Sequence, residues 1–195
     1  MESYLVSATP EIRTRVDTAF RSTLGKLGPS ILRFKEAFQR PRPYQVAFMS
    51  GRPFSYEWAK SAVTPSLMSG HSIQGVIGSC GAYLALRRDL ETAPGAVLGL
   101  QQYGTDFGDR RVFAGVHYPS DNIASWFIAL RLCDHLFGSA GQVVKDFLVQ
   151  AITGCSHVYA ALRKTTDDDK KSVFTEPMRQ LTVELRRPAQ KQEGE

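Results

Sequence analysis

The sequence has no long apolar run and no segment typical of a secretion signal. Nowhere in its 195 residues do about 18 consecutive apolar residues occur, the length that a membrane-spanning helix requires. The first residues, MESYLVSATPEIRTRVD, also lack the apolar stretch and small-residue cleavage site of a secretory signal. The sequence therefore predicts a soluble, cytoplasmic protein without a membrane span, or a periplasmic or secreted protein if a leader has been removed.

Cysteine is also scarce. The three cysteines, Cys80, Cys133 and Cys155, are widely spaced, and no CxxC pair or closely spaced histidine pair accompanies them. These absences argue against a disulfide framework, a redox pair or a zinc site. We therefore expect free thiols and no bound metal.

The net charge is positive but dispersed. A formal charge of +5 and an isoelectric point near 9.2 would suit an anionic partner. The Lys and Arg residues are spread along the chain rather than gathered in a stripe. The sequence therefore predicts no nucleic-acid partner, and charges outside the motifs described below are expected to be solvated.

The pattern that does run through the chain is helical periodicity. Apolar residues recur at a spacing of three to four, sustained strand-like alternation is missing, and the 43% hydrophobic content suffices for one core. We predict an all-α, single-domain helical bundle over residues 1–165, followed by a charged linker, a short helix and a polar tail over 166–195. Thr9 and Pro10 predict the cap and first residue of the first helix. Helices are expected over 11–24, 31–38, 72–86, 93–107, 121–136, 142–162 and 176–187, with a loop over 40–53.

Two short motifs supply cations, an imidazole and a glycine amide. KEAFQRPRP contains Lys35 and Arg42, and SLMSGHS contains Ser69, Gly70 and His71. The helix predicted over 72–86 starts just after the second motif, and the first amides of a helix favour an anion because they lack intrahelical partners. Gly70 would allow the backbone to approach that anion closely.

A third motif, DRRVFAGVHYPSD, contains Arg111, His117 and Asp121. The three motifs together provide three cations, two imidazoles, a hydroxyl, a glycine amide and a carboxylate. This set can hold and attack a tetrahedral oxyanion such as phosphate. The combination therefore indicates phosphoryl transfer.

The motifs resemble the signature of the type 2 phosphatidic acid phosphatase superfamily, which includes bacterial class A acid phosphatases and vanadium-dependent haloperoxidases. That signature is Lys-x6-Arg-Pro, then Pro-Ser-Gly-His, then Ser-Arg-x5-His-x3-Asp. This chain has Met68 in place of the proline and Arg110 in place of the serine. The resemblance implies the helical bundle of those enzymes and a metal-independent hydrolase of phosphomonoesters, pyrophosphate or lipid phosphates.

Each candidate site residue has an expected role. His117 is the predicted nucleophile, oriented by Asp121, and it forms a phosphohistidine, while His71 protonates the leaving group and then activates water. The two imidazoles should therefore hold different charge states and give a bell-shaped pH profile. No cofactor is expected, because the cations do the work of Mg²⁺ in kinases. The expected phosphate-binding residues are Lys35, Arg42, Ser69, Gly70 and Arg111.

Two other functions stay open. A vanadium-dependent haloperoxidase would hold vanadate in the same cage with His117 as axial ligand, although known members of that kind are generally longer chains. A non-catalytic phosphate- or headgroup-binding module would keep the cage without needing both imidazoles. The expected partner is a phosphorylated small molecule or lipid. The sequence leaves open which substrate is used and whether the chain forms a homo-oligomer.

Several residues near or between the motifs have two interpretations. Arg40, Arg52 and Arg110 are candidates for charges on the substrate side, and His135 and His157 are expected to be packed or surface imidazoles. Five aromatic residues would either contact the organic part of a substrate or pack in the core: Tyr44, Phe48, Phe54, Tyr56 and Trp58.

Overall fold

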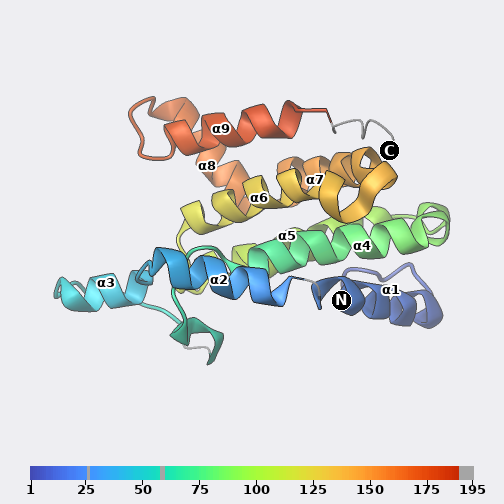
Figure 1. The fold of residues 1–195 in the computed structure, drawn as a ribbon, viewed down its shortest axis with the longest axis horizontal. Helices are drawn as coiled ribbons and strands as arrows, with labels where there is room; N and C mark the ends of the chain where they lie inside the picture. Colours follow the sequence, from blue (N-terminus) through green and yellow to red (C-terminus); the bar gives the residue numbers. More distant parts are fainter. Residues whose placement is uncertain (26, 58–59, 189–195) are drawn as a thin grey trace.

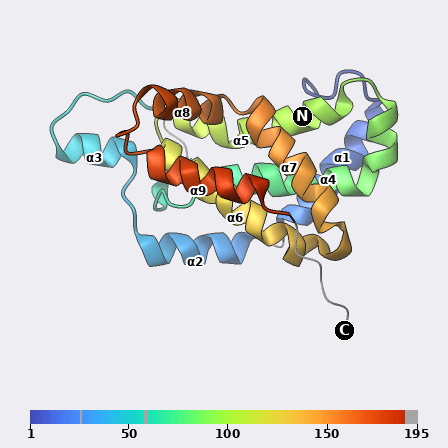
Figure 2. The same cartoon turned by 90° about the horizontal axis from the view of Figure 1, so that it is seen from above.

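Helices account for every regular element in residues 1–25, 27–57 and 60–188, the residues that the computed structural model describes. The predicted all-α class is therefore confirmed. In Figure 1, α4 to α7 lie between α9 on one side and α1 and α2 on the other, while α3 lies at one end; Figure 2 shows the same arrangement from above. The elements are α1 (Pro10–Leu24), α2 (Gly28–Phe38), α3 (Pro43–Met49), the 3₁₀ helix η1 (Lys60–Val63), α4 (Gly70–Thr92), α5 (Ala96–Phe113), α6 (Pro119–Phe137), the 3₁₀ helix η2 (Gly138–Ala140), α7 (Gly141–Cys155), α8 (His157–Asp168) and α9 (Thr175–Arg186).

Side-chain caps set the starts of two important helices. Thr9 accepts a hydrogen bond from the Ile12 amide, and α1 begins at Pro10, as predicted. Ser69 caps α4 in the same way, accepting from the Ser72 amide at 3.2 Å. Helix α4 therefore starts at Gly70, two residues before its predicted start.

Three predictions of helix boundaries were wrong. The expected loop over 40–53 contains α3, because Pro43 occupies the first helical position, where its missing N–H costs nothing. Helix α5 continues beyond the predicted end at 107, so that Arg111 lies on a helix. The single helix expected over 142–162 is α7 followed by α8, because Ser156 has extended backbone angles and caps α8.

Glycines bring α4 and α5 into close contact. A methyl group added at Gly75 would lie 2.3 Å from the carbonyl oxygen of Gly104. Any side chain at position 75 would therefore push the two helices apart. This glycine seam (Gly75 and Gly104) fixes how closely the helix bearing His71 approaches the helix bearing Arg111.

The C-terminal helix joins the same apolar core as the rest of the bundle. Helix α9 packs against α6, and Met178, Leu181 and Leu185 are buried in the core that also contains Trp126. Helix α8 continues through Asp168, three residues beyond the boundary expected at 165. The predicted polar tail falls mostly on residues 189–195, outside the described residues. Among the described helices, none combines the length and apolarity that crossing a membrane demands.

Candidate active site

Separate segments of the chain line one pocket of about 280 Å³, which we call the site pocket. Helix α2 contributes Lys35, the N-cap of α3 contributes Arg42, the first turn of α4 contributes Gly70 and His71, and the loop before α6 contributes His117. The fold thus brings together residues from all three sequence motifs.

His117 is held at both ring nitrogens. Its Nδ1 lies 3.0 Å from Asp121 Oδ2, and its Nε2 lies 3.1 Å from Arg42 Nη1. Because a carboxylate accepts and a guanidinium donates, these partners assign the proton to Nδ1 and the lone pair to Nε2. Burial lowers the pKa of His117 to about 4, against a smaller opposing effect of Asp121. At neutral pH the ring is therefore neutral, with its lone pair directed toward Arg42.

Asp121 is fully buried and has two sets of partners. Its Oδ2 accepts from His117 and from the Tyr118 amide at 3.0 Å, while its Oδ1 accepts from Arg40 Nη1 at 2.7 Å. Arg40 also donates to Ser120 Oγ at 3.0 Å and lies 4.1 Å above the Tyr118 ring.

Arg40 has a role that the sequence did not indicate. It was one of three candidates for a charge on the substrate side, and it pairs with the carboxylate oxygen that His117 does not use. It contacts residues from the start of α6, about 80 positions further along the chain (80 for Ser120 and 81 for Asp121). Spacing within the first motif gives no signal of such a distant pair, so the sequence did not predict it.

Two cations are anchored by the backbone of the segment before α4. Lys35, only 6% exposed, donates from Nζ to the Pro65 carbonyl at 2.5 Å. Arg42 donates from Nε to the Thr64 carbonyl and from Nη1 to the Val116 carbonyl, both at 2.7 Å. Burial, and next the charge of Arg42, lower the pKa of Lys35 to about 8. These contacts fix both cations at the pocket wall.

Arg111 adds a third cation next to the pocket. It lies in the last turn of α5, and burial lowers the pKa of its guanidinium. Its carbonyl oxygen accepts from the amides of Val116 and His117, at 3.2 and 3.1 Å, and so shapes the loop that presents His117. We call Lys35, Arg42 and Arg111 the cation cluster.

The charges of the whole cation cluster act on His71. Its ring lies 5.7 Å from the Phe107 ring, centroid to centroid. Burial lowers the pKa of His71 to about 4, and the charges of Arg111, His117, Arg42 and Lys35 act in the same direction. Both imidazoles are therefore neutral at neutral pH in the free protein, whereas the predicted mechanism needs them to hold different charge states. A bound anion would offset the same cations and raise the pKa of His71.

Ser69 has a different position from the other predicted phosphate ligands. Its side chain is buried, caps α4 and does not line the site pocket. The Ser125 hydroxyl donates to its carbonyl oxygen at 3.1 Å, tying the start of α4 to α6. Ser69 thus positions Gly70 and His71.

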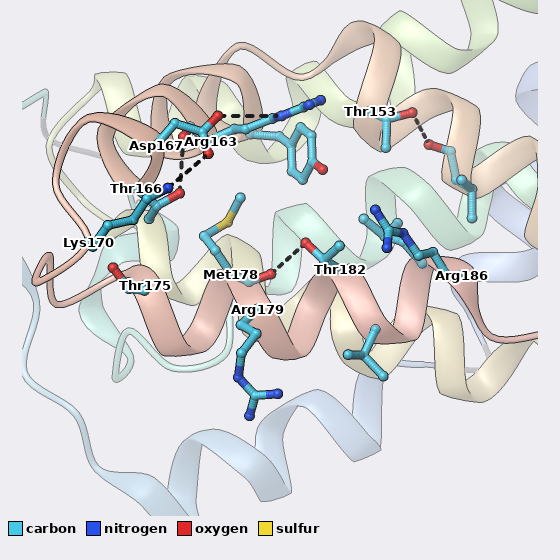
Figure 3. Close-up of a pocket in the computed structure, with 14 residues that line it drawn as sticks. Thr153, Arg163, Thr166, Asp167, Lys170, Thr175, Met178, Arg179, Thr182 and Arg186 are labelled. Atoms are coloured by element: carbon cyan, nitrogen blue, oxygen red, sulfur yellow. Dashed lines mark hydrogen bonds and ion pairs between the residues drawn. The ribbon is translucent and has the colours of Figure 1, made fainter.

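A larger pocket lies elsewhere. This pocket has a volume of about 600 Å³ and lies between α8 and α9. Figure 3 shows side chains that line it, such as Lys170, Met178 and Arg186. None of the predicted site residues lines it. Size therefore does not identify the site here, and we assign the chemistry to the smaller pocket.

The remaining predicted residues lie outside the site pocket. Arg110 is exposed and contacts the Tyr4 hydroxyl. His135 and His157 are exposed, so both are surface imidazoles. The aromatic residues are not core: four of them line a second pocket of about 490 Å³ together with Arg52, and the fifth, Trp58, lies outside the described residues. Those four are Tyr44, Phe48, Phe54 and Tyr56.

Comparison with known proteins supports the interpretation of the motifs. Among curated proteins and among solved structures, none matches this chain. A family model described as the PAP2 superfamily matches residues 19–140, more than half of the chain, and this range contains all three motifs. The match supports phosphatase-type hydrolysis of phosphorylated substrates as the general activity. On this evidence the chain belongs to the PAP2 superfamily, the family that its three motifs resemble.

Proposed function

We propose that this chain is a metal-independent phosphomonoester hydrolase that acts through a phosphohistidine at His117. The geometry of His117 carries the proposal, because Asp121 fixes its Nδ1 proton while its Nε2 lone pair faces Arg42 in the site pocket. A cation beside this lone pair would bind the anionic oxygens of a phosphate and so place the phosphorus atom within reach of Nε2.

Binding of the ester would redistribute the hydrogen bonds of Arg42. The cation cluster neutralises the phosphate oxygens, and the Gly70 amide at the start of α4 donates to one of them. Arg42 Nη1 lies 3.1 Å from His117 Nε2, so it transfers this hydrogen bond to a phosphate oxygen when the ester enters. That exchange frees the lone pair of Nε2 for reaction.

The reaction then takes place in two steps. In the first, His117 Nε2 forms a bond to phosphorus, the bond from phosphorus to the ester oxygen breaks, and the leaving alkoxide takes a proton from His71. In the second, a water oxygen attacks phosphorus, its proton passes to His71, and the phosphorus–nitrogen bond breaks. The products are an alcohol and inorganic phosphate, and both histidines return to their starting states.

His71 must be protonated when the ester is bound. The cations that lower its pKa to about 4 in the free protein are the ones that a phosphate dianion would offset. We therefore infer that the bound substrate raises the pKa of His71, so that the ring is protonated at the working pH.

The direct test is hydrolysis of p-nitrophenyl phosphate in the presence of EDTA. We expect turnover to persist with the chelator, because Lys35, Arg42 and Arg111 supply the positive charge. Labelled substrate should leave an acid-labile, alkali-stable phosphoryl group on the wild-type protein and none on His117→Ala. Hydrolysis that requires added metal, or label that persists in His117→Ala, would contradict the proposal.

A vanadate-dependent peroxidase remains the second candidate, because vanadate is a tetrahedral oxyanion that would contact the same cations and His117. The same preparation, supplied with vanadate, peroxide and bromide, should then brominate a phenolic dye. Bromination without phosphate ester hydrolysis would favour this alternative.

A further inference from the structure

Exposed apolar side chains are concentrated in one part of the molecule. Of the fifteen large hydrophobic side chains that are exposed in the described residues, nine lie between positions 32 and 63. Single exposed apolar residues are normal, but a group of this density marks an interaction surface.

The centre of this group is α3 and the loop after it, residues 43–57, which we call the apolar arm. No residue of α3 is buried, and Figures 1 and 2 show the helix at one end of the molecule, outside the bundle. Phe48 is 86% exposed and Met49 is 70% exposed. Both line the 490 Å³ pocket with Phe54 and Tyr56.

The apolar arm is connected to the site pocket. Its first helical residue follows Arg42, and Tyr44 of α3 stacks on Tyr56 with ring centroids 4.5 Å apart. Exposed apolar residues also reach the pocket itself, since Leu32 lines it and is 59% exposed. A surface that contacts the arm therefore lies next to the catalytic residues.

Exposed cations accompany these apolar side chains. Of the six Lys or Arg in residues 32–63, Lys35, Arg40 and Arg42 belong to the site, whereas the other three, Arg33, Arg52 and Lys60, are exposed, as are Glu36 and Glu57. Arg52 lines the arm's pocket, and Arg52 and Lys60 are exposed. Phe and Met side chains flanked by exposed cations are the pattern of a segment that lies in a lipid headgroup region.

We propose that the apolar arm docks onto the surface of an anionic lipid bilayer, with Phe48 and Met49 inserted among the lipid chains. The charge favours this occupant over a second copy of the chain, because each copy carries a net charge of +5, whereas the bilayer surface is anionic. The docking does not depend on the hydrolase reaction, although it would bring the site pocket to the membrane surface.

The test is co-sedimentation with vesicles of phosphatidylcholine alone and of phosphatidylcholine mixed with phosphatidylglycerol. We expect binding to the mixed vesicles, weakened about tenfold or more in the double variant Phe48→Ser, Met49→Ser. Arg52→Gln should weaken it by roughly fivefold at low salt. The matched control is Val173→Ser, which removes an apolar side chain that is 82% exposed on a different part of the surface and should change nothing.

Two further measurements separate this inference from the proposed function. His117→Ala should bind vesicles like the wild type, and the Phe48, Met49 double variant should hydrolyse p-nitrophenyl phosphate normally. Wild-type protein that ignores anionic vesicles, or binds them equally in the double variant, would overturn the inference. If the wild type binds no vesicles but self-associates, and the double variant does not self-associate, the arm would instead be a contact between copies of the chain.

Discussion

Two buried polar clusters in this protein differ in how their charges are balanced. The first surrounds Asp109, a carboxylate on α5 that is 1% exposed. It accepts from Ser156 Oγ at 2.8 Å, from the Val158 amide at 3.1 Å and from Asn122 Nδ2 at 3.1 Å. These donors come from α6 and from the N-cap and first turn of α8, so the carboxylate joins α5 to these two helices through neutral partners.

The second is the cation cluster of the site pocket. Three cations lie near one carboxylate, Asp121, which already pairs with Arg40. Burial, and next the nearby charge of Arg42, lower the pKa of Lys35 to about 8. The comparison indicates that the Asp109 cluster, with its neutral donors, holds the fold together, whereas the net positive charge of the cation cluster suits the anionic ligand of the proposed reaction.

The largest expected effect is on catalysis. Replacing His117 with Ala should lower the rate of p-nitrophenyl phosphate hydrolysis by about 10⁴-fold or more, because the nucleophile is lost. Stability should change little, since Asp121 keeps its ion pair with Arg40. The control is His135→Ala, which alters an exposed imidazole on α6 and should leave both rate and thermal midpoint unchanged. Full activity in His117→Ala would show that the site pocket does not act through His117.

The Asp109 cluster should respond in the opposite way. Asp109→Ala leaves buried donors of Ser156 and Val158 without their acceptor, so the free energy of unfolding should fall by about 3 kcal/mol in urea titrations. Asp106→Ala, one helical turn earlier, removes a carboxylate that is 25% exposed and should cost about 1 kcal/mol or less. Equal losses in the two variants would show that the Asp109 cluster has no special structural role.

Arg40 connects catalysis and charge balance. Arg40→Ala should reduce the rate by about tenfold and raise the pKa of His117, because Asp121 would then direct its full charge at the imidazole. The acidic limb of the pH profile should therefore move to higher pH. Arg40→Lys keeps the charge and should restore most of the wild-type profile. An unchanged profile in Arg40→Ala would mean that the ion pair only supports the fold.

The smallest expected effect is a proton taken up on anion binding. The pKa of His71 lies near 4 in the free protein against an ordinary value of 6.5, and a bound anion raises it. At a pH between these two values, the protein should therefore take up a fraction of a proton when it binds sulfate. Calorimetry in buffers of different ionisation enthalpy measures this uptake. His71→Gln should bind sulfate without this uptake. Uptake that persists in His71→Gln would assign the proton to another group.

Local signals in the sequence predicted much of this structure. Thr9 with Pro10 marked the start of α1, and apolar periodicity placed most of the helices. The prolines around position 43 misled the prediction, because the same residue that ends a helix also fits the first turn of a new one. The break at Ser156 was missed because the apolar period continues through it into α8.

The site was predictable to the extent that its residues are neighbours in a motif. The pairing of His117 with Asp121 follows from a spacing of four on one segment, and it was expected. The pairing of Arg40 with Asp121 spans 81 positions and depends on how the segment after α2 meets the start of α6, which no local pattern encodes. The pKa of His71 likewise depends on charges from four other segments.

The close approach of Gly75 to the Gly104 carbonyl, 2.3 Å from where a methyl group would lie, also bears on which substrates the enzyme accepts. With α4 and α5 in close backbone contact, the first turn of α4, where Gly70 and His71 line the pocket, has no room to move toward α5. Larger or smaller leaving groups must then be accommodated elsewhere in the lining, for example at Leu32 and Thr64. Engineering of substrate preference should therefore begin at α2 and the segment before α4.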